Sequence, residues 1–342
     1  MVTATPHQRR AKQPTGFGEY LQTCAYAPEK LATAGSDENS VSISDPFGGF
    51  LVPRDHSAAL IQRLYDFSRL ANRCRRLPMP KSGHLELPAV RETSRVDGSR
   101  LGGIVSGWTF ETQLPTTSRV PAQQILMNAH TLRVLIPCTE EVLRQPSALE
   151  AFIFSAATEE LAVMLDSAII SGAVAQPTGI LQDAATIVVT KETSQSADTI
   201  VPENVLNMVG RLWPYSDNTA VFLCSRSAQK ELLLNCRELL RFAEPNAVGA
   251  RMSLAGYPLL PVEQCPALGD KGDLMLVDLN EYALAQTDVQ SASSAFVRWV
   301  AHERVFKFWI EVDGRSIWKE PVAPMNNADG SQSPFVVLED RA

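Results

Sequence analysis

The sequence lacks the features of a membrane protein and of a disulfide-rich secreted protein. No run of about eighteen apolar residues occurs, so no stretch could cross a bilayer as a helix. The first ten residues contain no apolar segment of a secretory signal. The six cysteines form no C-x-x-C pair and have no histidine at ligand spacing, so we expect reduced, mostly buried thiols in a cytosolic protein.

Positive charge is also scarce. The chain has 31 lysines and arginines against 38 aspartates and glutamates, which gives a net charge of −7. A basic surplus is typical of nucleic-acid-binding proteins, so the composition argues against that function for the whole molecule. An acidic protein can still lie beside nucleic acid that it must not hold tightly, and its contact with DNA should then be weak and non-specific.

Familiar catalytic and nucleotide-binding motifs are missing as well. Residues 269–272 (GDKG) have the composition but not the spacing of a phosphate-binding loop. His302 and Glu303 lack the second histidine of a zinc-binding helix, and Glu159 and Glu160 are adjacent on a predicted helix and therefore point apart. The sequence thus predicts no catalysis, cofactor or metal site, although an active site assembled from distant loops of a two-domain α/β enzyme would escape this search.

The strongest pattern that is present predicts a long helix over residues 147–171. Ser147 and Glu150 form an S-x-x-E capping box, and apolar residues then recur at helical spacing as far as Ile169. Gly172 stands where a helix C-terminal glycine is expected. A helix about twice the usual length is more typical of a structural spine than of one layer in a compact enzyme.

The segments around this helix differ in their patterns. Residues 1–47 are mostly small and polar, and such an arm cannot bury a core of its own. Residues 80–120 hold almost no sustained apolar face, which favours an extended hairpin. The remaining segments are a first strand and helix at 48–79 (the helix at about 55–73), an α/β alternation at 199–295, and a strand at 296–312 that returns at 315–322 after a hairpin turn at Asp313-Gly314.

The predicted extended loop carries the candidate contact residues. Charges of both signs alternate in it, and two aromatic residues lie near its return. We expect these side chains to pair with a neighbouring subunit, the alternative being a merely solvated surface. The candidates are Arg91, Glu92, Arg95, Asp97, Arg100, Trp108 and Phe110.

Five short motifs follow one another along the chain. They are GGFLVP at 48–53, SGHLELP at 82–88, TEEVL at 139–143, QPTGIL at 176–181 and LAGYP at 254–258. In this order they resemble the major capsid protein of tailed bacteriophages, which has the Hong Kong 97-type shell fold. The last motif departs from the family pattern, because Leu259 stands where the family has a valine.

This resemblance implies an α+β subunit with the Hong Kong 97-type capsid fold. A peripheral domain, at 121–198 and 296–342, would hold the spine helix and a long C-terminal hairpin. An axial domain would span 199–295, and the arm at 1–47 and the extended loop at 80–120 would embrace neighbours. An encapsulin-type nanocompartment shell is the alternative with the same fold, and the long arm and the QPTGIL motif favour the phage version.

The resemblance also implies partners. Copies of the chain would form hexamers and pentamers of an icosahedral virion capsid, assembled in the host cytoplasm around double-stranded DNA, with portal and scaffolding proteins and without a membrane. Only some 45 residues precede the first motif and the sequence begins with Met1, which favours a separate scaffolding protein over a removed segment. Some members cross-link a loop lysine to an asparagine near the C-terminus, here Lys81 with Asn326 or Asn327. Because Lys81 lies at the loop base and not at its tip, we do not expect this bond.

Overall fold

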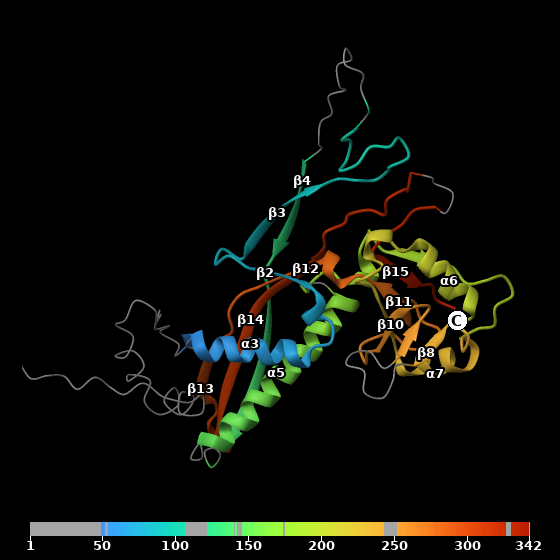
Figure 1. Ribbon diagram of the computed structural model, residues 1–342. Coiled ribbons are helices and arrows are strands. Elements are labelled where there is room, and N and C mark those ends of the chain that lie inside the picture. Colours follow the sequence, from blue (N-terminus) through green and yellow to red (C-terminus); the bar gives the residue numbers. More distant parts are fainter. Residues whose placement is uncertain are drawn as a thin grey trace, which may run out of the picture. The chain divides into compact units, whose positions relative to one another are not determined.

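The computed structural model describes residues 49–51, 54–106, 108, 122–139, 141, 146–173, 175–242, 252–325 and 330–341 (Figure 1). The predicted arm at 1–47 lies outside the described residues. The chain divides into two compact units. The first unit comprises Met1–Ser68, Thr131–Ala162 and Thr287–Glu311, and the second comprises Arg69–His130, Val163–Gln286 and Val312–Ala342.

Helices and strands alternate irregularly along the chain, as the predicted α+β class requires. The helices, with 3-10 helices written η, are α3 (Arg54–Phe67), η1 (Ala71–Arg73), α5 (Pro146–Ile170), η2 (Ile180–Gln182), α6 (Pro202–Arg211), η3 (Pro214–Ser216), α7 (Arg226–Asn235), η4 (Leu279–Glu281) and η5 (Trp299–Ala301). The strands are β1 (Gly49–Leu51), β2 (Arg75–Pro78), β3 (His84–Val90), β4 (Ala122–Asn128), β5 (His130–Thr139), β6 (Ile187–Val189), β7 (Val221–Cys224), β8 (Leu240–Phe242), β9 (Met252–Leu254), β10 (Tyr257–Pro261), β11 (Leu274–Val277), β12 (Tyr282–Gln286), β13 (Gln290–Arg298), β14 (Glu303–Ser316) and β15 (Phe335–Leu338).

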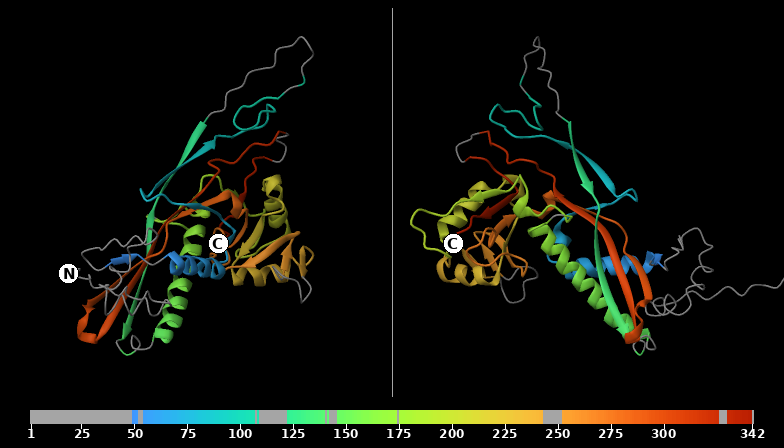
Figure 2. Two further views of the ribbon diagram at one scale, coloured as in Figure 1. Left: turned by 60° about the vertical axis from the view of Figure 1, so that its left-hand side comes forward. Right: turned by 180° about the vertical axis from the view of Figure 1, so that it is seen from behind.

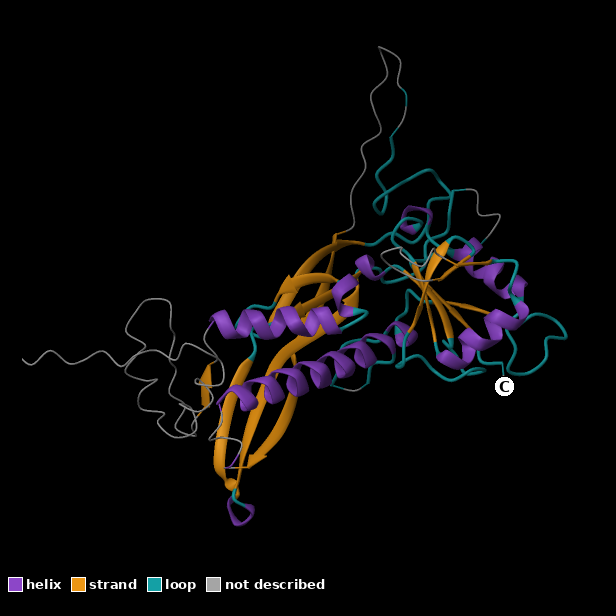
Figure 3. Ribbon diagram, turned by 60° about the horizontal axis from the view of Figure 1, so that its bottom comes forward, coloured by secondary structure: helices purple, strands orange, loops and turns teal. Residues whose placement is uncertain are grey.

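The first unit is built on an antiparallel ladder. β13 pairs with β1 on one side and with β14 on the other, and β5 also pairs with β14. Alternate side chains of β14 are buried at Phe306, Phe308 and Ile310, which is the pattern of a strand with one face on a core. Figure 3 shows α3 and the first part of α5 lying along these strands. Leu60 and Leu64 of α3 are buried, as expected for the apolar face of an amphipathic helix.

The long helix α5 coincides with the helix predicted for residues 147–171 and begins one residue earlier, at Pro146. Its buried side chains recur at every fourth position, which keeps them on one face. These residues are Ile153, Ala157, Leu161, Leu165 and Ile169. In the TEEVL motif Thr139 ends β5 and Glu141 is helical, while residues 142–143 lie outside the described residues.

The predicted hairpin turn at Asp313-Gly314 is wrong. β14 continues through both residues to Ser316, and the chain reverses instead at η5, between β13 and β14. Gly314 is needed for close packing, because a Cβ there would lie 2.5 Å from the Oη of Tyr282. The glycine therefore lets β14 pass over a tyrosine ring of β12, its antiparallel partner in the second unit.

The helix predicted for about residues 55–73 ends early, because α3 stops at Phe67. The buried carboxylate of Asp166, on α5, accepts hydrogen bonds from the backbone N–H groups of Arg69, Leu70 and Ala71 at 3.0, 3.4 and 3.3 Å. These donors are thereby satisfied by a side chain and not by a continuing α-helix. The chain turns through η1 into β2, which pairs in parallel with β12.

The QPTGIL motif forms a turn that contacts two strands of the second unit. The N–H of Thr178 donates to the carbonyl of Gly314 at 2.8 Å, and the hydroxyl of Tyr282 donates to the carbonyl of Thr178 at 2.9 Å. Gly172, which ends the long helix with a φ of 53°, leaves no room for a Cβ against Gly179. The motif therefore fixes the end of α5 to β12 and the last part of β14.

The second unit contains a seven-stranded sheet in the order β6-β15-β11-β7-β10-β9-β8. Figure 3 shows α6 and α7 beside its strands. One buried cluster joins both helices to the sheet, with Val205 and Met208 from α6, Ala228 and Leu232 from α7, and Phe222 from β7. The sheet draws two strands, β6 and β15, from outside the 199–295 segment.

Five of the cysteines lie within the described part of the chain, and all are buried and free of disulfides. Burial raises the pKa of Cys224 to about 12 and that of Cys138 to about 11. The thiols are therefore protonated at neutral pH and behave as small apolar side chains. Cys24 lies outside the described residues.

A fully buried ion pair joins the segment after β15 to the loop before β11. The Arg341 guanidinium contacts the Asp273 carboxylate, and both side chains are 0% exposed. Arg341 also donates to the carbonyls of Thr199 and Glu339, each at 2.8 Å, and Asp273 accepts from the N–H of Gly269 at 3.0 Å. Buried charges need such partners, so each member of this network depends on the others to remain in the folded structure.

Replacing Arg341 should destabilise the second unit more than replacing an exposed arginine. In Arg341→Ala, Asp273 would stay buried without its counter-charge, which costs about 3–5 kcal/mol of unfolding free energy. Arg91→Ala is the control, because the side chains of Arg91 and its partner Glu320 are 57% and 46% exposed. Such surface pairs contribute about 1 kcal/mol or less. Urea unfolding followed by tryptophan fluorescence measures both losses, and equal losses would contradict the assigned role.

Candidate assembly surface

The predicted extended loop begins as a regular hairpin. β3 and β4 pair antiparallel from His84↔Asn128 to Val90↔Ala122, so the return strand lies beyond the predicted loop end at residue 120 (Figure 2). Side chains alternate along β3, and one face joins a buried cluster with Ile125 and Met127 of β4 and with Ala283 and Ala285 of β12. The base of the hairpin therefore has an apolar core, which sequence reasoning missed.

The segment that follows β3 is fastened to its own chain. The N–H of Arg95 donates to the carbonyl of Ala323 at 2.9 Å, and the N–H of Ala323 donates to the carbonyl of Thr93 at 3.0 Å. The Arg95 guanidinium pairs with the Glu92 carboxylate and lies 4.3 Å from the ring centroid of Trp213. We call Glu92, Thr93, Arg95, Trp213 and Ala323 together the clasp.

The clasp is anchored in an aromatic cluster. The ring of Trp213 lies 5.0 Å from that of Trp318 and 5.4 Å from that of Tyr215, and the indole N–H of Trp318 donates to Glu281 at 2.9 Å. A partly desolvated cation–π contact contributes about 0.5–2 kcal/mol, and each aromatic pair adds about 0.5–1.5 kcal/mol. The clasp therefore restrains the base of the loop more strongly than a surface ion pair could.

The charged candidates are thus engaged within the chain to different degrees. The side chains of Arg95 and Glu92 are only 16% and 12% exposed. Arg91 donates to Glu320 at 2.8 Å in an exposed pair. Asp97 closes a turn, and its hydrogen bonds from the side chain and backbone of Ser99 hold the pKa of Asp97 below its usual range.

The loop also leaves several apolar side chains exposed to solvent. The structure places Arg100 in a tight turn, where its N–H donates to the carbonyl of Ile104 at 2.9 Å. Trp108 is fully exposed, and four aliphatic side chains around that turn are also exposed. These five residues, Val96, Leu101, Ile104, Val105 and Trp108, are called the loop patch below. Single exposed apolar residues are ordinary, but a group of this size on one loop is typical of an interaction site.

Sequence reasoning named Trp108 but missed the aliphatic members of the loop patch. Their signal was available, because aliphatic residues in a glycine-rich turn region have no core to join. Phe110, Asn326 and Asn327 lie outside the described residues. Lys81 lies exposed in the turn before β3. Because both asparagines lie outside the described residues, the structure gives no geometry for the cross-link.

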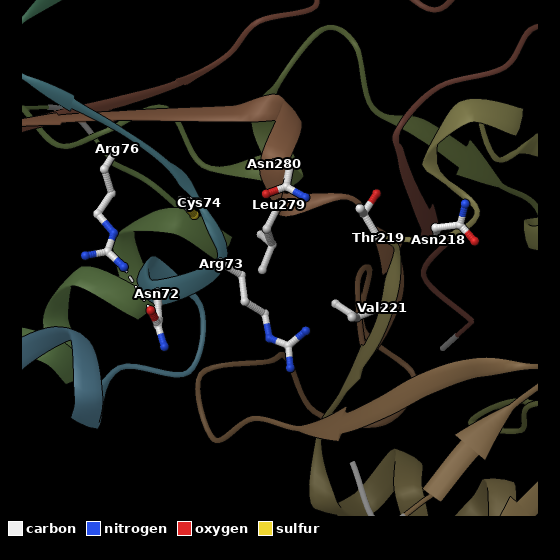
Figure 4. A pocket seen from close by; sticks show the side chains of 9 residues that line it. All are labelled: Asn72, Arg73, Cys74, Arg76, Asn218, Thr219, Val221, Leu279 and Asn280. Atoms are coloured by element: carbon white, nitrogen blue, oxygen red, sulfur yellow. Dashed lines mark hydrogen bonds between the residues drawn. The ribbon is translucent and has the colours of Figure 1, made fainter. Parts of the chain in front are cut away.

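The second unit also has a cavity of about 400 Å³ (Figure 4). It lies among η1, β2, the loop that leads into β7, β7 itself and η4. Its lining residues are Asn72, Arg73, Cys74, Arg76, Asn218, Thr219, Val221, Leu279 and Asn280. The Cys74 thiol donates to the carbonyl of Leu70 at 3.4 Å, and burial raises its pKa. The lining offers guanidinium and amide groups but neither an activated nucleophile nor a carboxylate base.

The described residues contain no group of three His, Cys, Asp or Glu side chains that could hold a metal ion. None of the helices described combines the length and the apolar character that a membrane crossing requires. Glu303, considered above with His302, accepts a hydrogen bond from Arg298 at 2.8 Å.

Comparison with known proteins gives one family and many structural matches. The model of the phage capsid family matches residues 48–327. The capsid of an empty GTA particle, computed with C5 symmetry, aligns with a TM-score of 0.59 at 16% identity, over 81% of this chain and 90% of that chain. A chain from Microbacterium phage Oxtober96 aligns with a TM-score of 0.52 at 15% identity, over 80% and 90%.

An encapsulin complex is also among the matches. The holo-SrpI encapsulin complex from Synechococcus elongatus aligns with a TM-score of 0.51 at 13% identity, over 79% of this chain and 86% of that chain. At these identities the likenesses show a shared fold. No curated protein sequence gives a significant match.

Removing the Arg95 guanidinium should weaken the hydrogen bonds that hold the base of the loop. The variant Arg95→Ala loses the ion pair with Glu92 and the cation–π contact with Trp213, about 1–2 kcal/mol together. The backbone N–H groups of residues 95 and 323 should therefore exchange with solvent about 5- to 30-fold faster. Hydrogen exchange followed by mass spectrometry measures this rate. Arg100→Ala is the control, because the Arg100 side chain is exposed outside the clasp. Unchanged protection in Arg95→Ala would show that the backbone pairing alone holds the segment.

Proposed function

The chain belongs to the phage capsid family and is a major capsid protein, and we propose that its copies close into an icosahedral shell of hexamers and pentamers around double-stranded DNA. The observation that carries this proposal is the family match over residues 48–327, which covers most of the chain. The Hong Kong 97-type fold supports it. Head-to-tail contacts between identical subunits generate rings when the rotation closes, which is how one chain can form both ring sizes.

In this proposal each part of the subunit has a role in the shell. The long helix α5 and the strand β14 lie in the peripheral domain at 121–198 and 296–342. The axial domain at 199–295 contributes α6, α7 and five strands of the seven-stranded sheet, β7 to β11. The arm at 1–47 and the extended loop reach neighbouring subunits. For the arm the reason is its composition, because a segment without a core of its own gains order by folding onto a partner. For the loop the reason is the exposed apolar side chains beyond its packed base.

The loop patch is proposed as the part of the extended loop that contacts a second copy. Its residues are apolar and exposed, while Glu92 and Arg95 are already paired in the clasp. Burying apolar surface gives about 25 cal/mol per Å², so covering this patch favours association without new ion pairs. The clasp supports the contact, because a loop whose base is already fixed loses less conformational entropy on binding.

The remaining parts of the proposal concern the contents and surroundings of the shell. The net charge of −7 supports weak, non-specific contact with packaged DNA, since a strongly basic wall would hold the duplex tightly. Portal and scaffolding proteins are the further partners, assembly takes place in the host cytoplasm, and the subunit ends in the virion capsid. The protein acts without catalysis, cofactor or membrane contact.

An encapsulin-type shell that packages enzymes is the second candidate. The structural likeness to the Synechococcus elongatus complex supports it. That likeness is one of fold and does not reveal cargo, whereas the family match favours the phage version. The contents of purified particles, DNA or enzyme, separate the two.

Expression of the chain with a matching scaffolding protein should yield closed particles. Negative-stain electron microscopy should show shells, and sedimentation should show rings or particles in place of a single slow species. The physical reason is that exposed apolar surface on the subunit is covered only when neighbours are present. Finding monomers alone, both with and without a scaffold, would refute assembly.

Polar substitutions in the loop patch should block assembly without unfolding the subunit. In the triple variant Val96→Ser, Leu101→Ser and Trp108→Ser, particle yield should fall at least about tenfold, because about 1.4 kcal/mol of lost contact energy changes an association constant by that factor. The unfolding midpoint should stay near that of the parent, since all three side chains are already exposed. Particle yield is measured by sedimentation.

The control for this variant replaces three other exposed apolar residues of the second unit. Leu206→Ser, Leu234→Ser and Phe242→Ser start from side chains that are 54%, 54% and 69% exposed. Parent-like assembly of the control together with failure of the loop variant supports the proposal. Equal yields from both variants would remove the loop patch from the interface.

A further inference from the structure

An arginine without a partner extends into the cavity of the second unit. Among the described residues, none forms a hydrogen bond or ion pair with the Arg73 guanidinium. Figure 4 shows this side chain extending from η1 to a point between Asn72 and Val221 in that view. The second cationic residue, Arg76, donates to Asn72 at 2.9 Å. Arg73 is therefore the free cation of the cavity lining.

Two acidic side chains next to the elements that line the cavity already accept hydrogen bonds from other groups. Asp278, which lies buried beside η4, accepts from the hydroxyl of Thr219 at 2.7 Å and from the N–H of Asn280 at 3.1 Å. Asp166 accepts from backbone N–H groups ahead of η1. None of the residues lining the cavity is acidic. The described part of the chain therefore offers the guanidinium a cavity but no counter-ion.

The lining indicates the chemistry of a missing occupant. Val221 and Leu279 are buried and form an apolar part of the wall, while Asn218 and Asn280 add amide groups. A guanidinium forms paired, charge-assisted hydrogen bonds with a carboxylate, and the amides can donate further bonds to the same oxygens. The apolar wall suits the short aliphatic stem of a glutamate or aspartate side chain.

The backbone that carries Arg73 is held in place before any ligand binds. The Asp166 carboxylate holds the backbone just ahead of η1, and β2, just after it, is paired with β12. An arginine presented on such a restrained segment loses less entropy on binding than one on a free loop. The cavity is therefore a preformed site.

We propose that this cavity is a socket for a glutamate or aspartate side chain of a second copy of the chain. The inference rests on the proposed function, because only an assembling subunit meets further copies of itself. Charge supports this occupant, since each copy carries 38 acidic residues against 31 basic ones. A duplex phosphate is a poorer fit, because its rigid backbone would have to enter a cavity of about 400 Å³ with a partly apolar wall.

Cross-linking tests the proposal directly. Arg73→Lys keeps the positive charge and places a primary amine in the cavity, where a carbodiimide can join it to a touching carboxylate as an amide with loss of water. Particles assembled from a mixture of unlabelled and ¹⁵N-labelled copies should give a cross-linked peptide that joins position 73 of one copy to an acidic residue of another. Mass spectrometry identifies both peptides.

The control substitution is Arg241→Lys, which places an amine on an exposed position of β8. Cross-links from position 73 between copies, at several times the yield from position 241, support the socket. A link from position 73 within a single copy, or none in intact particles, overturns it.

Charge reversal separates the two possible anions. Arg73→Glu should reduce particle yield at least about tenfold while the subunit keeps its unfolding midpoint, because the side chain is exposed in the isolated chain. Normal particles that no longer retain DNA would assign the cavity to phosphate and overturn the proposal. If the parent forms no particles, the proposed function fails; if parent and Arg73→Glu assemble equally, only the socket fails.

Discussion

The buried Asp166 carboxylate determines the path of the chain through the second unit. An ionised carboxylate inside a protein is costly unless hydrogen-bond donors surround it, and here backbone N–H groups of Arg69, Leu70 and Ala71 supply them. Those groups can reach the carboxylate only if α3 has ended and the chain has turned. η1, the pairing of β2 with β12 and the placing of Arg73 at the cavity all follow from that turn.

Local patterns in the sequence predicted the elements that local forces determine. The long helix followed from apolar spacing and a terminal glycine. The α+β class, in contrast, was expected from the resemblance of five short motifs to a capsid family. The errors occurred where a distant residue decides. Gly314 was interpreted as a turn glycine, but the ring of Tyr282, which no local pattern places beside it, explains why a side chain is excluded there. Asp166 interrupts the apolar spacing of the long helix, and a carboxylate on a buried helix face predicts nearby hydrogen-bond donors.

The candidate surface was predictable in its location but not in its chemistry. The glycine-rich segment after β3 indicated a loop that leaves the core, and Trp108 is indeed fully exposed. The charges of Glu92 and Arg95 suggested contacts with a neighbour, yet Trp213 and Ala323 bind this segment within the chain. Sequence patterns do not predict such partners, because cation–π contacts and strand bridges between distant residues produce no periodicity in the sequence. The apolar side chains, which find no partner in the fold, are the better indicator of an interface.

The clasp and the socket share one physical logic. Association costs several kcal/mol of translational, rotational and side-chain freedom, and a subunit that must bind many copies of itself benefits when each contact is already positioned. Arg95 on Trp213 restrains the loop base, and Asp166 restrains the segment that carries Arg73. Internal polar contacts thus fix the backbone, while apolar loop residues and the Arg73 guanidinium are left for partners. Polar groups that are satisfied within the subunit do not compete for those partners, so specificity rests on the few groups that remain.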